Sequence, residues 1–124
     1  MVNRILIIEE NDNNLKLFST ILNVNGYETL GAKTGSDGIR LAISEKPNLI
    51  LMDLQMPDMD GFEILKNIKS EPSLKDIPLI ALFPFARETD KSRFRKLGFA
   101  DCIAKPFVLH DFIKTIGEHL NCGP

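Results

Sequence analysis

Residues 49–53, Leu-Ile-Leu-Met-Asp, join four consecutive apolar residues to one carboxylate. A short apolar run without polar interruption is typical of a strand that is covered on both faces, as in a parallel sheet. A second run, residues 5–8 (Ile-Leu-Ile-Ile), ends in the same way at the acidic pair Glu9 and Glu10. Carboxylates are costly to place beside buried strands. Acids at the ends of two such strands therefore predict a shared cluster that either binds a cation or supplies a carboxylate nucleophile.

Along the rest of the chain, short apolar runs alternate with segments of helical periodicity, which is the pattern of βα units. The predicted strands are residues 4–8, 27–31, 48–53 and 77–83, with a shorter one at 100–104. Apolar residues spaced three and four apart predict the helices: Leu15, Phe18, Ile21 and Leu22; Ile39, Ala42 and Ile43; Ile64, Leu65 and Ile68; Leu109, Phe112, Ile113, Ile116 and Leu120. The sequence thus predicts an α/β fold with a doubly wound, five-stranded parallel sheet and helices on both faces.

Length and composition narrow the class of protein. With 124 residues, 44% of them hydrophobic, the chain is expected to form one domain over residues 1–124. A net charge of -2, from 15 basic and 17 acidic residues, provides no basic stripe for nucleic acid. The start of the sequence does not resemble a signal peptide and no apolar run approaches a membrane span, so we expect a cytoplasmic protein. Cys102 and Cys122 lack metal-ligand spacing and are expected to be free thiols.

In a doubly wound sheet, ligands bind outside the carboxyl ends of the strands, where the strand order reverses. Glu9, Glu10 and Asp53 are expected to meet there, and Lys105 would reach the same edge from the end of the fifth strand. Oxygen ligands beside a lysine suit Mg2+ and a phosphoryl group. The site is thus predicted to hold Mg2+, with Asp53 as a possible phosphoryl acceptor.

The loop after Asp53 is predicted to be tight and polar. Asp60, with Glu63 three residues later, resembles a capping box, and Gly61 follows the turn-rich residues 56–60. A helix is therefore expected to start directly after this loop. His110 and His119, on or near the last helix, are expected to be surface residues and are not assigned as ligands.

Three motifs together resemble the receiver domains of two-component response regulators. They are residues 7–11 (Ile-Ile-Glu-Glu-Asn), residues 49–61 (Leu-Ile-Leu-Met-Asp-Leu-Gln-Met-Pro-Asp-Met-Asp-Gly) and residues 104–107 (Ala-Lys-Pro-Phe), in the order and register of that family. The resemblance covers essentially the whole chain. Residues 14–18 and 26–30 are most similar to the single-domain, DivK-like kind.

The resemblance implies a flavodoxin-like, CheY-like receiver with strand order 2-1-3-4-5. It also implies a signalling domain rather than an enzyme, with at most self-phosphorylation and slow autodephosphorylation. The site residues it implies are Asp53 as phosphoacceptor, Glu9 and Glu10 as metal-binding acids, Gln55 as donor of a backbone carbonyl to Mg2+, Lys105 as phosphoryl partner, and a cis peptide bond before Pro106.

Four positions depart from the family pattern. Phe83 and Pro84 stand where a Thr or Ser and a small residue usually bind the phosphoryl oxygens through a hydroxyl and a backbone N–H. Phenylalanine has no hydroxyl and proline has no amide hydrogen, so neither hydrogen bond can form. Cys102 replaces the Tyr or Phe ring that follows the hydroxyl inward, and Glu10 replaces the more usual Asp metal ligand. Residues 83–85 either close the core over a degenerate pocket or expose an aromatic surface.

Two functions of different classes follow. In the first, a histidine kinase or phosphotransfer protein phosphorylates Asp53 with the help of Mg2+ and Lys105, and the changed surface acts on a downstream signalling protein. In the second, the chain is a pseudo-receiver, an interaction module that works without phosphorylation. Asp53, Lys105 and the acidic pair favour the first function, whereas Phe83 and Pro84 favour the second. A flavodoxin-like small-molecule binder is discounted, because no glycine-rich phosphate loop follows the first strand.

Overall fold

The computed structural model describes residues 3–84, 88–105 and 109–120, without the side chains of residues 83, 84, 88–91 and 105. Five parallel strands form one sheet in the order β2-β1-β3-β4-β5, which confirms the predicted fold class and strand order. The strands are β1 (Arg4–Ile8), β2 (Glu28–Ala32), β3 (Leu49–Asp53), β4 (Leu79–Pro84) and β5 (Asp101–Lys105). The helices are α1 (Asp12–Val24), α2 (Gly35–Glu45), α3 (Gly61–Lys69), α4 (Glu88–Leu97) and α5 (Leu109–Leu120).

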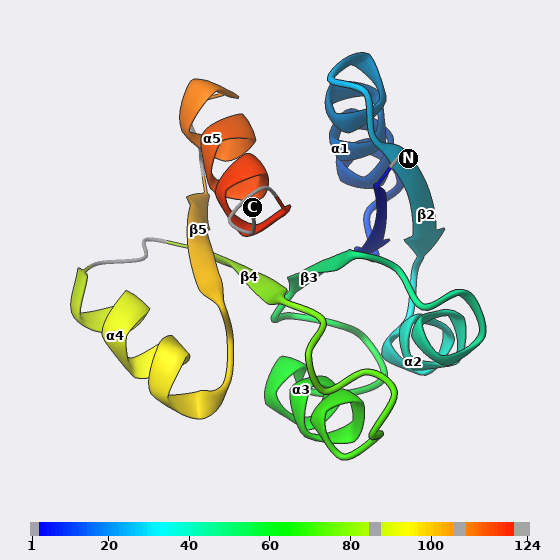
Figure 1. Cartoon of the computed structure of the whole chain (residues 1–124), viewed down its shortest axis with the longest axis vertical. Coiled ribbons are helices and arrows are strands. Elements are labelled where there is room, and N and C mark those ends of the chain that lie inside the picture. Colours follow the sequence, from blue (N-terminus) through cyan, green and yellow to red (C-terminus); the bar gives the residue numbers. More distant parts are fainter. Residues whose placement is uncertain (1–2, 85–87, 106–108, 121–124) are drawn as a thin grey trace.

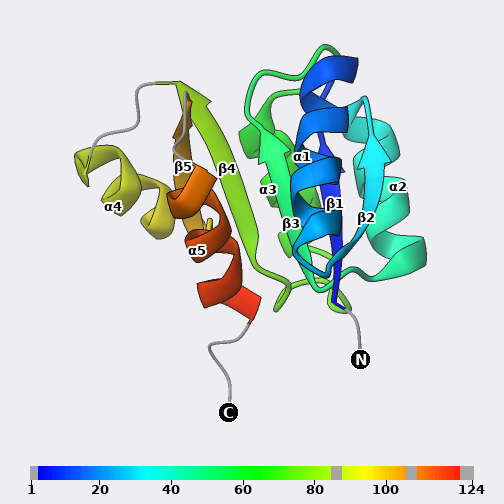
Figure 2. The ribbon, with the colours of Figure 1, turned by 90° about the horizontal axis from the view of Figure 1, so that it is seen from above.

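The sheet is the middle layer of three. Helices α1 and α5 lie on one face, and α2, α3 and α4 lie on the other (Figures 1 and 2). Side chains along β1 alternate between the two cores: Ile5 and Ile7 pack with the α1 and α5 side, and Leu6 and Ile8 pack with the opposite side. All four are fully buried. This burial on both faces explains why the strands read as uninterrupted apolar runs.

The predicted limits of β1 are confirmed, and those of the other four strands differ from the observed ones by one or two residues, for local reasons. The Tyr27 amide donates to Leu22 O at 3.1 Å in the turn after α1, where Gly26 has a φ of 91°, so β2 starts at Glu28. At β4, Pro78 has no amide hydrogen to donate to the sheet, and the register with β3 starts at Leu79. Backbone hydrogen-bonding chemistry therefore sets the ends that apolar patterning leaves imprecise.

The predicted buried faces of the helices are confirmed except at two positions. Ile43 is 45% exposed and Leu109 is 55% exposed, so neither belongs to the core. In α2 the buried face instead runs through two glycines and an alanine: Gly35, Gly38 and Ala42. A Cβ on Gly38 would lie 2.5 Å from Ile8 Cδ1, which shows how closely α2 approaches β1. Gly38 faces the sheet and Gly35 faces Met59 and Ile64, whereas Ile43 is outside this buried face.

Helix α4 has little apolar surface to attach it to the sheet. Among its described side chains, those of residues 92–97, Phe94 is the one that is buried. Its ring centroid lies 5.8 Å from that of Phe99 and 6.0 Å from that of Phe62 on α3. An aromatic cluster of three rings therefore connects α3, α4 and the start of β5.

Candidate functional site

Two buried carboxylates mark the carboxyl edge of the sheet. Glu9 directly follows β1 and is 2% exposed, and Asp53 ends β3 and is 7% exposed. Ile8 is in register with Met52, so Glu9 and Asp53 occupy the next positions of two adjacent strands. Within the described residues, they are the buried charged groups. Because burying a carboxylate is costly, such a pair is unusual without a role.

Backbone amides bind both carboxylates. The Gln55 amide donates to Asp53 Oδ1 at 2.9 Å, and the Asn11 amide donates to Glu9 Oε2 at 3.2 Å. Hydrogen bonds from N–H groups to a carboxylate are charge-assisted and fix its orientation. The start of α1 and the start of the loop after β3 thus hold the acids in place.

Glu10 is exposed, unlike Glu9. Across the parts of the chain that the structure describes, no three His, Cys, Asp or Glu side chains gather closely enough to hold a metal ion. The exposed Glu10 carboxylate is solvated by water, and approach to the two buried carboxylates would bring like charges together. The described donor set therefore centres on Glu9 and Asp53.

The loop from Leu54 to Asp60 is closed at its base. Gln55 and Asp60 form an antiparallel bridge, and the Gly61 amide donates to Leu54 O at 3.3 Å. A Cβ on Gly61 would lie 2.8 Å from Leu54 Cα, a backbone atom that cannot easily move aside, so this closure needs glycine. As predicted, Asp60 caps α3; its Oδ1 accepts from the Phe62 amide at 2.7 Å. The loop that contains Gln55 is thus a defined turn.

The backbone of the other residues predicted to contact the phosphoryl group also lies at the carboxyl edge of the sheet. Asp53 is in register with Leu82, so Phe83 and Pro84 come one and two positions further along β4. Pro84 is in register with Lys105 at the end of β5. The side chains of these three residues lie outside the described ones, as does Pro106 and with it the predicted cis bond. Their roles stay predictions.

Cys102 is a core residue. Its side chain is 1% exposed and belongs to the cluster that contains Phe94 and Phe99, on the face covered by α2, α3 and α4. As predicted, Cys102 is not part of a disulfide bond, whereas Cys122 lies outside the described residues. A small, buried side chain therefore occupies the position where the resemblance leads one to expect an aromatic ring.

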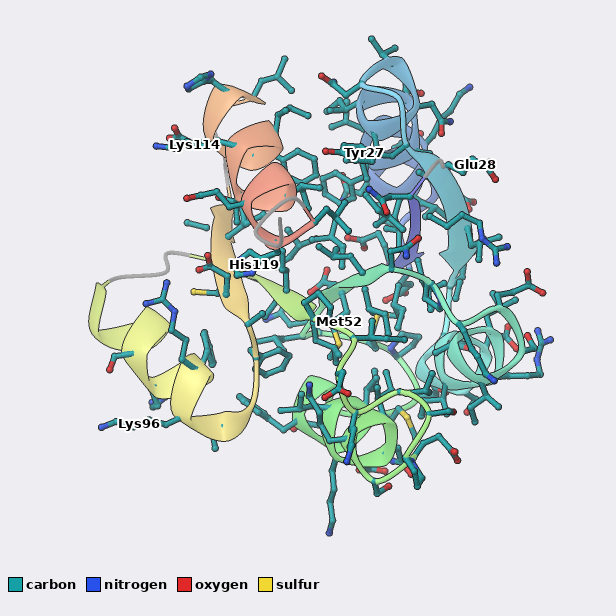
Figure 3. All side chains as sticks on the ribbon, viewed as in Figure 1. Tyr27, Glu28, Met52, Lys96, Lys114 and His119 are labelled. Atoms are coloured by element: carbon teal, nitrogen blue, oxygen red, sulfur yellow. The ribbon has the colours of Figure 1, made fainter. Side chains whose placement is uncertain are left out.

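A polar contact at the opposite end of β5, around Asp101, was not predicted from the sequence. His119 Nε2 lies 3.1 Å from Asp101 Oδ2, and Arg95 on α4 lies 3.6 Å from Asp101 Oδ1. Figure 3 shows His119 extending from α5 toward β5. His110 is exposed as predicted, whereas His119 is half-buried, so the surface prediction was wrong for it. Eighteen residues separate the pair along the chain, too far for any spacing signal.

None of the helices in the described ranges is both long and apolar enough to cross a membrane.

Comparison with known proteins agrees with the geometry. The response regulator receiver domain family matches residues 5–117. The chain belongs to this family of two-component signalling domains. Among its relatives is the polar-differentiation response regulator DivK of Brucella ovis, which is 38% identical over 120 residues that span 97% of this chain and 98% of the relative. DivK of Brucella suis matches to the same extent.

Solved structures show the same architecture. A CheY-like response regulator receiver domain protein from Methanospirillum hungatei is 30% identical, with a TM-score of 0.84 over 98% of this chain and 95% of that one. The receiver domain of a sensor histidine kinase from Pseudomonas aeruginosa is 26% identical, with a TM-score of 0.87 over 98% of this chain and 99% of that one. That receiver has a magnesium ion coordinated in its active-site cleft.

Proposed function

We propose that this chain is a phosphoryl-accepting signalling domain whose acceptor is Asp53. The observation that carries the proposal is the pair of buried carboxylates, Glu9 and Asp53, at adjacent strand ends on the carboxyl edge of a receiver-family sheet. The phosphoryl donor is a histidine kinase or a phosphotransfer protein. The whole of residues 1–124 acts as one receiver domain in the cytoplasm, and its phosphorylated surface acts by contact on a downstream signalling protein.

The donor set fits Mg2+ in its chemistry. Mg2+ prefers oxygen ligands, keeps several waters and is usually held by one or two carboxylates, so it does not require a third acid. Glu9, Asp53 and the backbone carbonyl of Gln55 would hold the ion, with Glu10 nearby in the sequence. The ion would neutralise negative charge on the transferring phosphoryl group. The magnesium in the Pseudomonas aeruginosa receiver supports this choice.

The chain's own residues would perform the transfer as follows. A carboxylate oxygen of Asp53 forms a bond to phosphorus while the bond from phosphorus to the donor's imidazole nitrogen breaks. The electron pair of that bond returns to the imidazole. The Gln55 amide, 2.9 Å from Asp53 Oδ1, keeps the carboxylate oriented for attack. Lys105 would pair its ammonium with the phosphoryl oxygens.

The test is intact-mass spectrometry after incubation with acetyl phosphate. With Mg2+ we expect a single phosphoryl adduct, and with a chelator in place of Mg2+ we expect little or none. A folded, Mg2+-bound protein that gains no adduct would contradict the proposal. That result would favour the pseudo-receiver function.

A specific observation favours the second candidate, the pseudo-receiver. Cys102 lies in a closed core, and Pro84 at the end of β4 has no amide hydrogen to offer a phosphate. A ligand shifts two states only by its difference in affinity for them. With few contacts that differ between states, phosphorylation of Asp53 would change the fold little, and binding of a partner would not depend on it.

The double variant Phe83→Thr with Pro84→Ala tests this deficit. It supplies one hydroxyl and one amide donor, and a charge-assisted hydrogen bond is worth roughly 1.5–3 kcal/mol. We expect a longer phosphate lifetime or larger amide chemical-shift changes on phosphorylation, measured by NMR. The matched control is Phe83→Val with Pro84→Ala, because valine has the shape of threonine without the hydroxyl. If the threonine variant behaves like wild type, the missing contacts are not the cause.

A further inference from the structure

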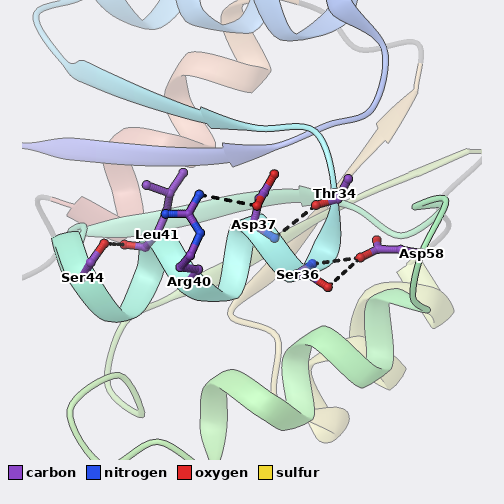
Figure 4. Close-up of polar contacts among 7 residues, drawn as sticks. All are labelled: Thr34, Ser36, Asp37, Arg40, Leu41, Ser44 and Asp58. Atoms are coloured by element: carbon purple, nitrogen blue, oxygen red, sulfur yellow. Dashed lines mark hydrogen bonds and ion pairs between the residues drawn. The ribbon is translucent and has the colours of Figure 1, made fainter.

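A carboxylate in the loop after β3 binds the start of a different helix. Asp58 Oδ1 accepts from the Gly35 amide at 2.7 Å, and Asp58 Oδ2 accepts from the Ser36 amide at 3.0 Å and from Ser36 Oγ at 2.9 Å. Figure 4 shows Asp58 approaching the first turn of α2 from the neighbouring loop. The backbone bonds from Gly35 and then Ser36 hold the pKa of Asp58 below its ordinary value. This side chain is therefore ionised at neutral pH.

Helix α2 has a cap of its own, so Asp58 does more than supply a missing one. Thr34 is the N-cap, and its Oγ1 accepts from the Asp37 amide at 3.1 Å (Figure 4). Asp58 binds the two amides that precede Asp37, from a position 22 and 23 residues away in the chain. Free amides at a helix start attract negative charge. The helix start thus serves as an anchor point for the loop.

The residue after Asp58 packs at the same place. A Cβ on Gly35 would lie 2.3 Å from Met59 Cγ and 2.9 Å from Met59 Sδ, so the loop lies directly against the helix start. At its base the loop is closed by the bridge between Gln55 and Asp60. The segment that contains Gln55 is therefore fixed both at its base and, through Asp58, at its tip.

We propose that Asp58 is a positioning residue, which fixes the loop after β3 on α2 and thereby holds the Gln55 carbonyl oriented for Mg2+. This inference rests on the proposed function, in which that carbonyl is a ligand. Only three residue steps separate Gln55 from Asp58, so a change of loop conformation at the tip reaches the carbonyl. Groups that orient a metal ligand commonly change metal affinity 10- to 100-fold when they are removed, as a general order of magnitude.

The test compares Asp58→Ala with Thr34→Ala. Both variants remove hydrogen bonds from the start of α2, but only the first releases the loop. Mg2+ alone is titrated while the amide signals of Leu54 and Gln55 are followed by NMR, and hydrogen exchange at the Gln55 amide is measured without metal. We expect Asp58→Ala to weaken Mg2+ binding about tenfold and to speed this exchange, and Thr34→Ala to do neither.

Asp58→Asn is a milder substitution that keeps the test valid if Asp58→Ala does not fold. Its single amide oxygen keeps part of the anchor, so its Mg2+ affinity should lie between those of wild type and Asp58→Ala. Equal Mg2+ affinity in wild type and Asp58→Ala, or an equal loss in Thr34→Ala, would overturn the positioning role alone. A wild-type protein that binds no Mg2+ would overturn the proposed metal site as well, which separates the two failures.

Discussion

Asp53→Asn is expected to abolish phosphoryl labelling by acetyl phosphate while the protein stays folded. An amide is not a nucleophile comparable to a carboxylate, so the acyl phosphate cannot form. In the wild-type protein the Gln55 amide donates to Asp53 Oδ1 at 2.9 Å. The side-chain oxygen of an asparagine can accept the same hydrogen bond, so the local turn should persist. Removing one of two buried like charges should also leave the free energy of unfolding unchanged or increased. Intact mass and thermal unfolding measure the two effects.

The matched control is Asp37→Asn. Asp37 is an exposed carboxylate in the first turn of α2, paired with Arg40 at 3.4 Å, and it is not one of the two buried carboxylates that end β1 and β3. Its replacement makes the same chemical change and should leave labelling at the wild-type level. If Asp53→Asn is still labelled, the acceptor is a different residue, and the assignment of the site to β3 would have to be abandoned.

Apolar patterning predicted the fold because β1 and β3 are buried on both faces. Their uninterrupted apolar residues would be exposed to water in any position other than the interior of a covered sheet. It also located Glu9 and Asp53, since the cost of burying a carboxylate makes an acid at the end of such a run conspicuous. The strand order could be inferred only through the family resemblance. Nothing in an isolated apolar run states which strand will be its neighbour.

The apolar pattern did not predict contacts that depend on the missing side chain of a glycine or on residues that lie far apart in the sequence. In α2, Gly38 packs against β1 and Gly35 packs against Met59, and a glycine contributes no hydrophobic signal although its missing side chain permits the approach. The bonds of Asp58 to α2 and of His119 to Asp101 join residues far apart in the chain. In the sequence, Asp58 was only one polar residue of a turn.

Phe94→Ala is expected to be the most destabilising single truncation on α4. The ring is fully buried in the aromatic cluster with Phe62 and Phe99, whereas the neighbouring charged side chains are exposed and Lys96 extends away from the sheet (Figure 3). Truncating a buried phenylalanine typically costs about 3–5 kcal/mol, from lost transfer free energy and the cavity that is left. A loss of that size lowers the melting temperature by more than about 10 °C in a domain of this size.

Leu97→Ala is the control on the same helix, because Leu97 is 51% exposed and alanine is a good helix former. It should cost less than about 1 kcal/mol, since little apolar area leaves the interior. Because Phe94 is the buried anchor among the described side chains of α4, its loss should also speed hydrogen exchange throughout that helix before the rest of the sheet is affected. If the two variants unfold at the same denaturant concentration, α4 must be held by contacts other than the aromatic cluster.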